Sequence, residues 1–191
     1  MEDTDVSPNA ITLLSGLIGM IGVYFSYISY PFVSLLMFLL NRTLDGLDGA
    51  YARKTNKTSD FGGYLDIVVD FTIYGFIPLG VTAADPDITS CLLLVFLEIT
   101  FFVNAAGLFF LSAIIEKTVH AQEKYGKKDE VTSLKMLPAL VEGSESLVFF
   151  CLIILFPPYQ NILYIVFGVG VSITIVQRVL WAYSNLPKGN S

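Results

Sequence analysis

Four aspartates with helical spacing dominate the chemistry that this sequence could perform. Asp45 and Asp48 lie three residues apart, and Asp66 and Asp70 lie four apart. On helices each pair shares one face, and two antiparallel helices joined by a short loop would bring both pairs into one cavity. Carboxylates at such distances repel one another unless a cation lies between them. Because hard divalent cations prefer oxygen ligands and metal pairs serve phosphoryl chemistry, we predict a two-metal site.

The same aspartates lie beside or inside strongly apolar segments. Asp66 and Asp70 belong to LDIVVDFTIYGF, where a bare carboxylate would cost about 2.5–3.5 kcal/mol or more inside a membrane. Solvation at a helix end would account for Asp48 or Asp60, but it does not account for this inner pair. A bound cation that neutralises the inner pair is therefore expected.

The elements that must position these residues are predicted to be membrane helices. The chain has 191 residues, of which 54% are hydrophobic and only 15% charged. Together with apolar runs of about 20 residues, this composition is typical of an all-α integral membrane protein. We expect one domain, residues 1–191, without a cleavable signal, because the acidic start MEDTDVSPNA lacks a basic region. Six transmembrane helices are predicted, at residues 11–29, 31–53, 60–84, 88–118, 136–156 and 159–184.

Basic residues orient these predicted helices. The loops after the first, third and fifth spans contain no Lys or Arg. By contrast, Arg53, Lys54 and Lys57 lie at or just after the end of the second span, and five lysines lie at or after the end of the fourth. Positively charged loops stay in the cytoplasm. We therefore expect a multi-pass protein with both termini and the active site facing the cytoplasm.

Residues 45–70 read DGLDGAYARKTNKTSDFGGYLDIVVD. This stretch resembles the signature of the CDP-alcohol phosphotransferase (phosphatidyltransferase) family, D-x2-D-G-x2-A-R-x8-G-x3-D-x3-D. Every fixed position and every spacing matches, at Asp45, Asp48, Gly49, Ala52, Arg53, Gly62, Asp66 and Asp70. The six spans, the cytoplasmic termini and SPNAIT at residues 7–12 extend the resemblance over nearly the whole chain. EGSES and RTLDGLDG most resemble small bacterial-type members.

The resemblance implies a metal-dependent membrane enzyme of phospholipid biosynthesis. Family members transfer a phosphoalcohol group from a CDP-alcohol, often CDP-diacylglycerol, to an acceptor hydroxyl of a small or lipid alcohol and release CMP. By resemblance, Asp45, Asp48 and Asp66 would ligate two Mg²⁺ or Mn²⁺ ions, and Asp70 would touch one metal and act as general base. A homodimer among membrane lipids is expected on the same ground, with no nucleic-acid partner.

The resemblance also assigns residues to the CDP donor. The positions that would contact the nucleotide or its diphosphate are Asn9, Gly49, Ala52, Arg53, Ser59 and Gly62. Pro8, Ala10 and Ile11 match the family's donor-contacting segment less specifically.

The acceptor side is less defined by the sequence. Arg178, deep in the sixth span, and Lys135 would suit an acceptor phosphate. Glu142 and Glu145 would instead suit a polyol or an ammonium group, or would simply pair with those bases. Snorkelling of Arg178 to the cytoplasmic surface remains an alternative.

Two features of the first spans concern packing. Arg42 lies three residues before Asp45 on the same helical face, where it either braces a metal-binding carboxylate or snorkels. Gly16, Gly19 and Gly22 recur every three residues in the first span, which predicts close approach of neighbouring helices.

Other functions fit part of the pattern. A CDP-choline or CDP-ethanolamine type phosphotransferase acting on a lipid alcohol is the alternative within the family. An intramembrane prenyltransferase also uses aspartates and Mg²⁺ on a diphosphate, but its motifs lie on well-separated helices. A cation-coupled membrane transporter would need carboxylates without the fixed spacing of Gly49, Ala52, Arg53 and Gly62.

Overall fold

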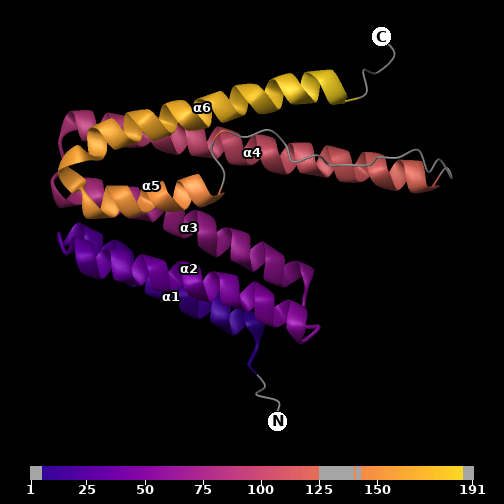
Figure 1. Ribbon diagram of the computed structural model, residues 1–191, viewed down its shortest axis with the longest axis horizontal. Coiled ribbons are helices and arrows are strands. Elements are labelled where there is room, and N and C mark those ends of the chain that lie inside the picture. Colours follow the sequence, from indigo (N-terminus) through magenta and orange to yellow (C-terminus); the bar gives the residue numbers. More distant parts are fainter. Residues whose placement is uncertain (1–5, 125–139, 141–142, 187–191) are drawn as a thin grey trace. The chain divides into compact units, whose positions relative to one another are not determined.

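The fold was obtained as a computed structural model, which describes residues 6–124, 140 and 143–186 (Figure 1). All regular elements in these ranges are helical, as predicted. They are α1 (Pro8–Tyr27), α2 (Pro31–Lys54), α3 (Asp60–Ala84), α4 (Ile88–Lys124), α5 (Gly143–Leu155) and α6 (Gln160–Asn185), with a 3₁₀ turn at Pro157–Tyr159.

The helices agree closely with the predicted spans. Among the described residues, four segments are long and apolar enough to cross a membrane: Pro8–Tyr27, Asp60–Ala84, Ile88–Lys117 and Pro157–Asn185. The helix α2 is not one of them. The apolar helix α5 is shorter, and the predicted start of its span at residue 136 lies outside the described residues. The prediction of six crossings and a cytoplasmic site stays a prediction.

Local capping explains where the helices around the site begin. Proline occupies the first turn of α1 and of α2, where its missing N–H costs nothing. The hydroxyl of Ser59 accepts from the backbone N–H of Gly62 at 3.0 Å and caps α3. The carboxylate of Asp87 accepts from the Ser90 hydroxyl and from the N–H groups of Ser90 and Thr89 before α4, and these hydrogen bonds lower the pKa of Asp87.

The backbone divides into two compact units. The first comprises Met1–Leu94 and Leu147–Leu163, and therefore contains α1, α2, α3 and most of α5. The second comprises Val95–Ser146 and Tyr164–Ser191, and contains most of α4 and α6. All four aspartates of the motif belong to the first unit.

In the first unit, α1 packs against both α2 and α3. A Cβ added to Gly19 would lie 2.6 Å from Cδ1 of Ile73 and 3.2 Å from Cγ of Asn41, and one on Gly16 would lie 2.9 Å from Val69. Close packing at these glycines is thus confirmed. The start of α1, the end of α2 and the start of α3 lie at the same end of this unit (Figure 1).

Polar side chains also tie the first unit together. Asn41 is fully buried and donates its Nδ2 hydrogen to the carbonyl oxygen of Ser15 at 2.8 Å, which joins α2 to α1. A second polar contact joins the end of α3 to the starts of α4 and α6. There Gln160 accepts from Thr82 at 3.3 Å and donates to Ser90 at 3.4 Å. The apolar core between these polar contacts comes from α2, α3 and α5, and includes Phe38, Ile73, Ile77, Phe150 and Ile153.

In the second unit, α4 packs against α6. The rings of Phe101 and Phe167 meet edge to face with centroids 5.2 Å apart. A Cβ on Gly168 would lie 2.4 Å from the Phe96 ring, so α6 needs a glycine at this contact.

Replacing Gly19 with alanine should destabilise the protein. The added methyl would overlap Ile73 and press on buried Asn41, and overpacking of this kind costs about 1–3 kcal/mol. The matched control is Gly46→Ala, where nothing lies within 4 Å of the added Cβ and where alanine improves helix propensity by up to about 1 kcal/mol. Thermal unfolding of both variants in detergent measures the difference. Equal melting temperatures would show that α1 does not depend on this close contact.

Candidate metal and nucleotide site

Three carboxylates of the motif converge at the end of the first unit. One oxygen each from Asp45, Asp48 and Asp66 lies within 4.8 Å of the others. The helical spacing predicted this juxtaposition, because Asp45 and Asp48 share a face of α2 and Asp66 lies on the first turns of α3. Among the described residues, the Oδ1 atoms of Asp45 and Asp66 are buried without a hydrogen-bond partner. Buried anionic oxygens without donors fit a divalent cation.

Asp48 is the most buried of the three and has a partner on another helix. Its side chain and that of Thr12 are nearly inaccessible, at 5% and 3% exposure, and the Thr12 hydroxyl donates to Asp48 Oδ2. Thr12 is the last residue of SPNAIT, but the sequence alone assigned it no part in the site. The only signal was its place one helical turn after Asn9.

A cavity of about 270 Å³ adjoins the carboxylates, close to the lower end of the size range of small-ligand sites. Its wall combines the start of α1, the end of α2, the following loop and the start of α3. All six residues predicted to bind the CDP donor line it, namely Asn9, Gly49, Ala52, Arg53, Ser59 and Gly62. Thr12, Lys57, Thr58 and Gly63 also line it and were not predicted. Asp48 and Asp66 face the same cavity, so a ligand there would reach the carboxylates.

Two of the residues that line this cavity, Gly49 and Gly62, are glycines without a side chain. A Cβ on Gly62 would lie 3.1 Å from Oδ1 of Asn9 and 3.1 Å from Oγ of Ser59. A Cβ on Gly49 would lie 3.3 Å from Nη1 of Arg53. Side chains at either position would therefore crowd the polar groups that face the cavity. That these polar groups contact a nucleotide stays a prediction.

Asp70 lies close to a guanidinium group. Its Oδ1 accepts a hydrogen bond from Nη2 of Arg42 at 2.7 Å. Nη1 of the same arginine lies 3.7 Å from Oδ2 of Asp45. Of the two alternatives for Arg42, the structure thus shows bracing, with Asp70 on the next helix as the closer carboxylate.

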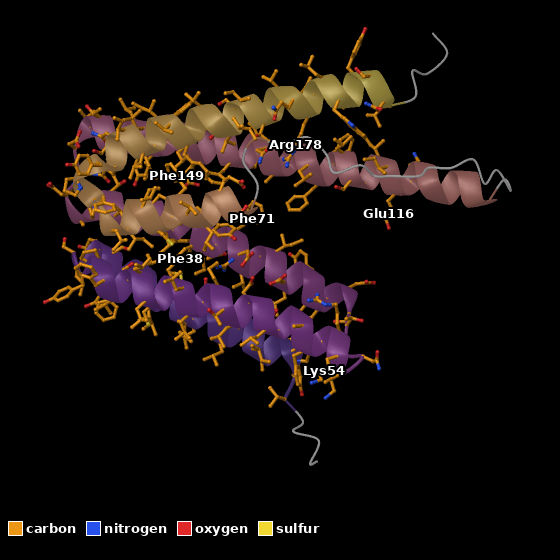
Figure 2. The ribbon with its side chains drawn as sticks, viewed as in Figure 1. Phe38, Lys54, Phe71, Glu116, Phe149 and Arg178 are labelled. Atoms are coloured by element: carbon orange, nitrogen blue, oxygen red, sulfur yellow. The ribbon has the colours of Figure 1, made fainter. Side chains whose placement is uncertain are left out.

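The residues predicted for the acceptor are only partly described. In the second unit, Arg178 lies on α6 (Figure 2) and donates from Nη1 to Oδ1 of Asn104 on α4 at 2.6 Å. Both residues line a largely apolar cavity of about 280 Å³. Glu145 is exposed at the start of α5 and accepts from the Ser144 hydroxyl at 3.0 Å, whereas Lys135 and Glu142 lie outside the described residues. The acceptor assignment stays a prediction.

A family model described as CDP-alcohol phosphatidyltransferase matches residues 5–176, most of the chain. The chain belongs to this family. The resemblance inferred from the motif is thereby confirmed, and the protein is an enzyme that performs phosphatidyl transfer in phospholipid synthesis. Family membership favours this activity over the transporter and prenyltransferase alternatives.

Similar proteins extend this family assignment. The inner membrane protein YnjF of Escherichia coli is 32% identical over 186 residues, which cover 97% of this chain and 87% of that protein. An archaetidylinositol phosphate synthase of Pyrococcus horikoshii is 34% identical over 65 residues, about a third of each chain. The fold is similar to that of the Mycobacterium tuberculosis phosphatidylinositol phosphate synthase, solved with manganese and citrate. That structure has a TM-score of 0.67 and 18% identity, over 97% of this chain and 87% of the other.

This phosphatidyltransferase is an integral, multi-pass membrane protein, as its apolar helices and its similarity to an inner membrane protein indicate.

Adding Mn²⁺ should raise the melting temperature of this phosphatidyltransferase in detergent. A cation bound only by the folded protein stabilises it by mass action, and here it would also relieve repulsion within the carboxylate cluster. We expect Asp66→Asn to lose most of the shift, because it removes a charge from the cluster. Asp85→Asn removes an exposed carboxylate after α3 and should retain the full shift. An equal Mn²⁺ response in both variants would contradict the assignment of the cluster.

Proposed function

We propose that this family member transfers a phosphatidyl group from CDP-diacylglycerol to an acceptor hydroxyl and releases CMP. The observation that supports this most directly is the carboxylate cluster beside a cavity lined by every predicted donor residue. Two Mg²⁺ or Mn²⁺ ions would be held by Asp45, Asp48 and Asp66, and Asp70 would touch one of them. The manganese in the Mycobacterium tuberculosis synthase supports this choice of cation.

The residues of the cavity would bind and orient the donor. Bound divalent cations would neutralise the diphosphate and make CMP a workable leaving group. Arg53 would add positive charge beside that diphosphate, while Gly49 and Ala52 would let the cytidine lie close to α2. Asn9 would hold the nucleotide from α1, next to Gly62.

Asp70 would act as the general base. It would take the proton of the acceptor hydroxyl while the acceptor oxygen forms a bond to the phosphorus of the phosphatidyl group. The bond from that phosphorus to the oxygen shared with CMP breaks, and CMP leaves with the bonding electrons. Catalysis would then consist mainly of positioning and charge stabilisation.

The membrane location suits such a donor. Arg53 and Lys54 end α2 and Lys57 follows it, at the cavity end of the first unit, and by the positive-inside rule this end would face the cytoplasm. Six crossings and cytoplasmic termini are part of the proposal. The acyl chains of the donor would remain in the bilayer while the nucleotide enters the cavity from the cytoplasm. By family resemblance we also propose a homodimer.

The acceptor is proposed more coarsely, as a small or lipid alcohol. Arg178 and Lys135 favour an acceptor that carries a phosphate, whereas Glu142 and Glu145 favour a polyol or an ammonium group. Two similar proteins are named as synthases of inositol phosphate lipids, which makes inositol phosphate the first acceptor to test. A CDP-choline or CDP-ethanolamine type reaction on a lipid alcohol remains the alternative.

Purified protein should release CMP from labelled CDP-diacylglycerol only when a divalent metal and a suitable acceptor are both present. The acceptor panel comprises inositol phosphate, inositol, glycerol phosphate, serine, choline and phosphatidylglycerol, and the labelled lipid formed identifies the acceptor. A parallel reaction with CDP-choline and diacylglycerol tests the alternative donor. Metal-independent release, or no release with either donor, would contradict the proposed function.

Asp70→Asn should lower turnover with CDP-diacylglycerol by at least about 100-fold, because it removes the base that accepts the hydroxyl proton. Folding and most of the donor affinity should survive, because Asp70 does not line the donor cavity. Steady-state kinetics with the acceptor from the panel measure the effect, with Asp85→Asn as the control. Near-normal turnover of Asp70→Asn would reject the base assignment.

A further inference from the structure

Arg42 is held by hydrogen bonds from three of its nitrogens. Nε donates to Oδ1 of Asn41 at 2.8 Å, Nη1 to the hydroxyl oxygen of Tyr74 at 2.8 Å, and Nη2 to Oδ1 of Asp70 at 2.7 Å. Only 12% of the arginine side chain is exposed. A side chain engaged on each of its nitrogens is fixed in position and orientation, unlike one that snorkels toward water.

The partners of Arg42 are themselves fixed by neighbouring helices. Asn41 is fully buried and donates to the backbone of α1. The Tyr74 ring stacks on Phe150 of α5, with centroids 5.0 Å apart and planes within 9°. The guanidinium carbon lies 5.0 Å from the centre of the Tyr74 ring and 5.9 Å from that of Phe38. Four helices of the first unit thus define where the guanidinium lies.

A fixed guanidinium restricts the orientation of the Asp70 carboxylate that it contacts. An aspartate side chain rotates about two bonds, so a free carboxylate samples several orientations. With Oδ1 held on Arg42, the other oxygen, Oδ2, has one defined direction. A general base must keep its accepting oxygen within hydrogen-bond reach of the proton, and a misplacement of about 1 Å can reduce the rate about 100-fold.

We propose that Arg42 is a positioning residue that holds the Asp70 carboxylate through Oδ1, so that Oδ2 takes the proton from the acceptor hydroxyl. This inference rests on the proposed function, in which Asp70 is the base. It assigns a task to Arg42, Tyr74 and Phe150, none of which belongs to the family motif or lines the donor cavity. The short helix α5 takes part as well, because its Phe150 stacks on Tyr74, which in turn accepts a hydrogen bond from Arg42.

A simpler role for Arg42 would be charge balance. The arginine lies among acidic side chains, 3.7 Å from Asp45 as well as 2.7 Å from Asp70. Charge balance requires only a cation, which lysine also supplies. Positioning requires the planar fork of donors, because a lysine ammonium cannot reproduce three hydrogen bonds in fixed directions. The Arg42→Lys variant therefore separates the two roles.

The experiment compares Arg42→Lys, Tyr74→Phe and Lys54→Gln in the full-length protein. Tyr74→Phe keeps the stacked ring but removes the oxygen that Arg42 contacts. Lys54→Gln removes a positive charge at the exposed end of the same helix (Figure 2) and serves as the matched control. For each variant, kcat and the donor KM are measured with CDP-diacylglycerol, Mn²⁺ and the acceptor from the panel. The Mn²⁺-induced rise in melting temperature is recorded alongside.

Arg42→Lys should lower kcat about 10–100-fold, while the donor KM and the Mn²⁺ shift change less than about threefold. Tyr74→Phe should lower kcat in the same direction by a smaller factor, and Lys54→Gln should match the wild type. This split distinguishes positioning from general destabilisation, because loss of folded protein would lower the active fraction and the melting temperature together.

Near-normal kcat in Arg42→Lys would overturn the inference. A parallel loss of kcat and of the Mn²⁺ shift would also overturn it, because charge balance would then explain the arginine. If Arg42→Lys does not fold, Tyr74→Phe decides, and its unchanged kcat would reject the proposal. A wild type that releases no CMP would overturn the proposed function and this inference together, whereas active wild type with active variants overturns the inference alone.

Discussion

Repulsion among carboxylates in apolar surroundings is the constraint on which the first unit depends. Oxygens of Asp45, Asp48 and Asp66 lie within 4.8 Å of one another. The protein offsets part of this repulsion with a donor from Thr12 and a cation from Arg42. The oxygens of Asp45 and Asp66 that lack a donor remain. A divalent cation would supply what the side chains do not, so we expect metal binding to stabilise the fold of this end.

The same constraint explains why α1 must approach the other helices so closely. Thr12 lies on α1, whereas Asp48 lies on α2 and Asn9 must reach Gly62 on α3. These contacts require the helix axes to lie closer together than large side chains would allow. At Gly19 the space that a side chain would need is already filled by Ile73 and Asn41. The small residues of α1, which look like a packing detail in the sequence, therefore let α1 form the third wall of the cavity beside the carboxylate cluster.

The parts of the site that were predictable from sequence are local. Helical spacing places Asp45 with Asp48, and one short loop brings Asp66 beside them, so few long-range contacts are needed. Thr12 and Tyr74 were not predictable, because their partners Asp48 and Arg42 lie 36 and 32 residues away. Such pairings depend on how the helices pack. The acceptor residues were least predictable, because Arg178 belongs to the second unit and a lone cation fits several roles.

Arg42 shows how packing decides between roles that sequence leaves open. By spacing alone its partner should be Asp45, three residues away on the same face, yet the closer carboxylate is Asp70 on α3. The aromatic rings of Phe38 and Tyr74 flank the guanidinium and direct its fork across to α3. As a result one of the four aspartates in the motif has this arginine as its close hydrogen-bond partner. Asp45, Asp48 and Asp66 face one another beside the cavity, where a cation can be shared. Asp70 accepts at 2.7 Å from the arginine that also lies 3.7 Å from Asp45. A carboxylate with one oxygen already committed to an arginine is poorly suited to bridge metals but well suited to present a single oxygen in one direction. That difference is set by Arg42 and its neighbours, so under the proposed function the roles of ligand and base would follow from residues outside the motif.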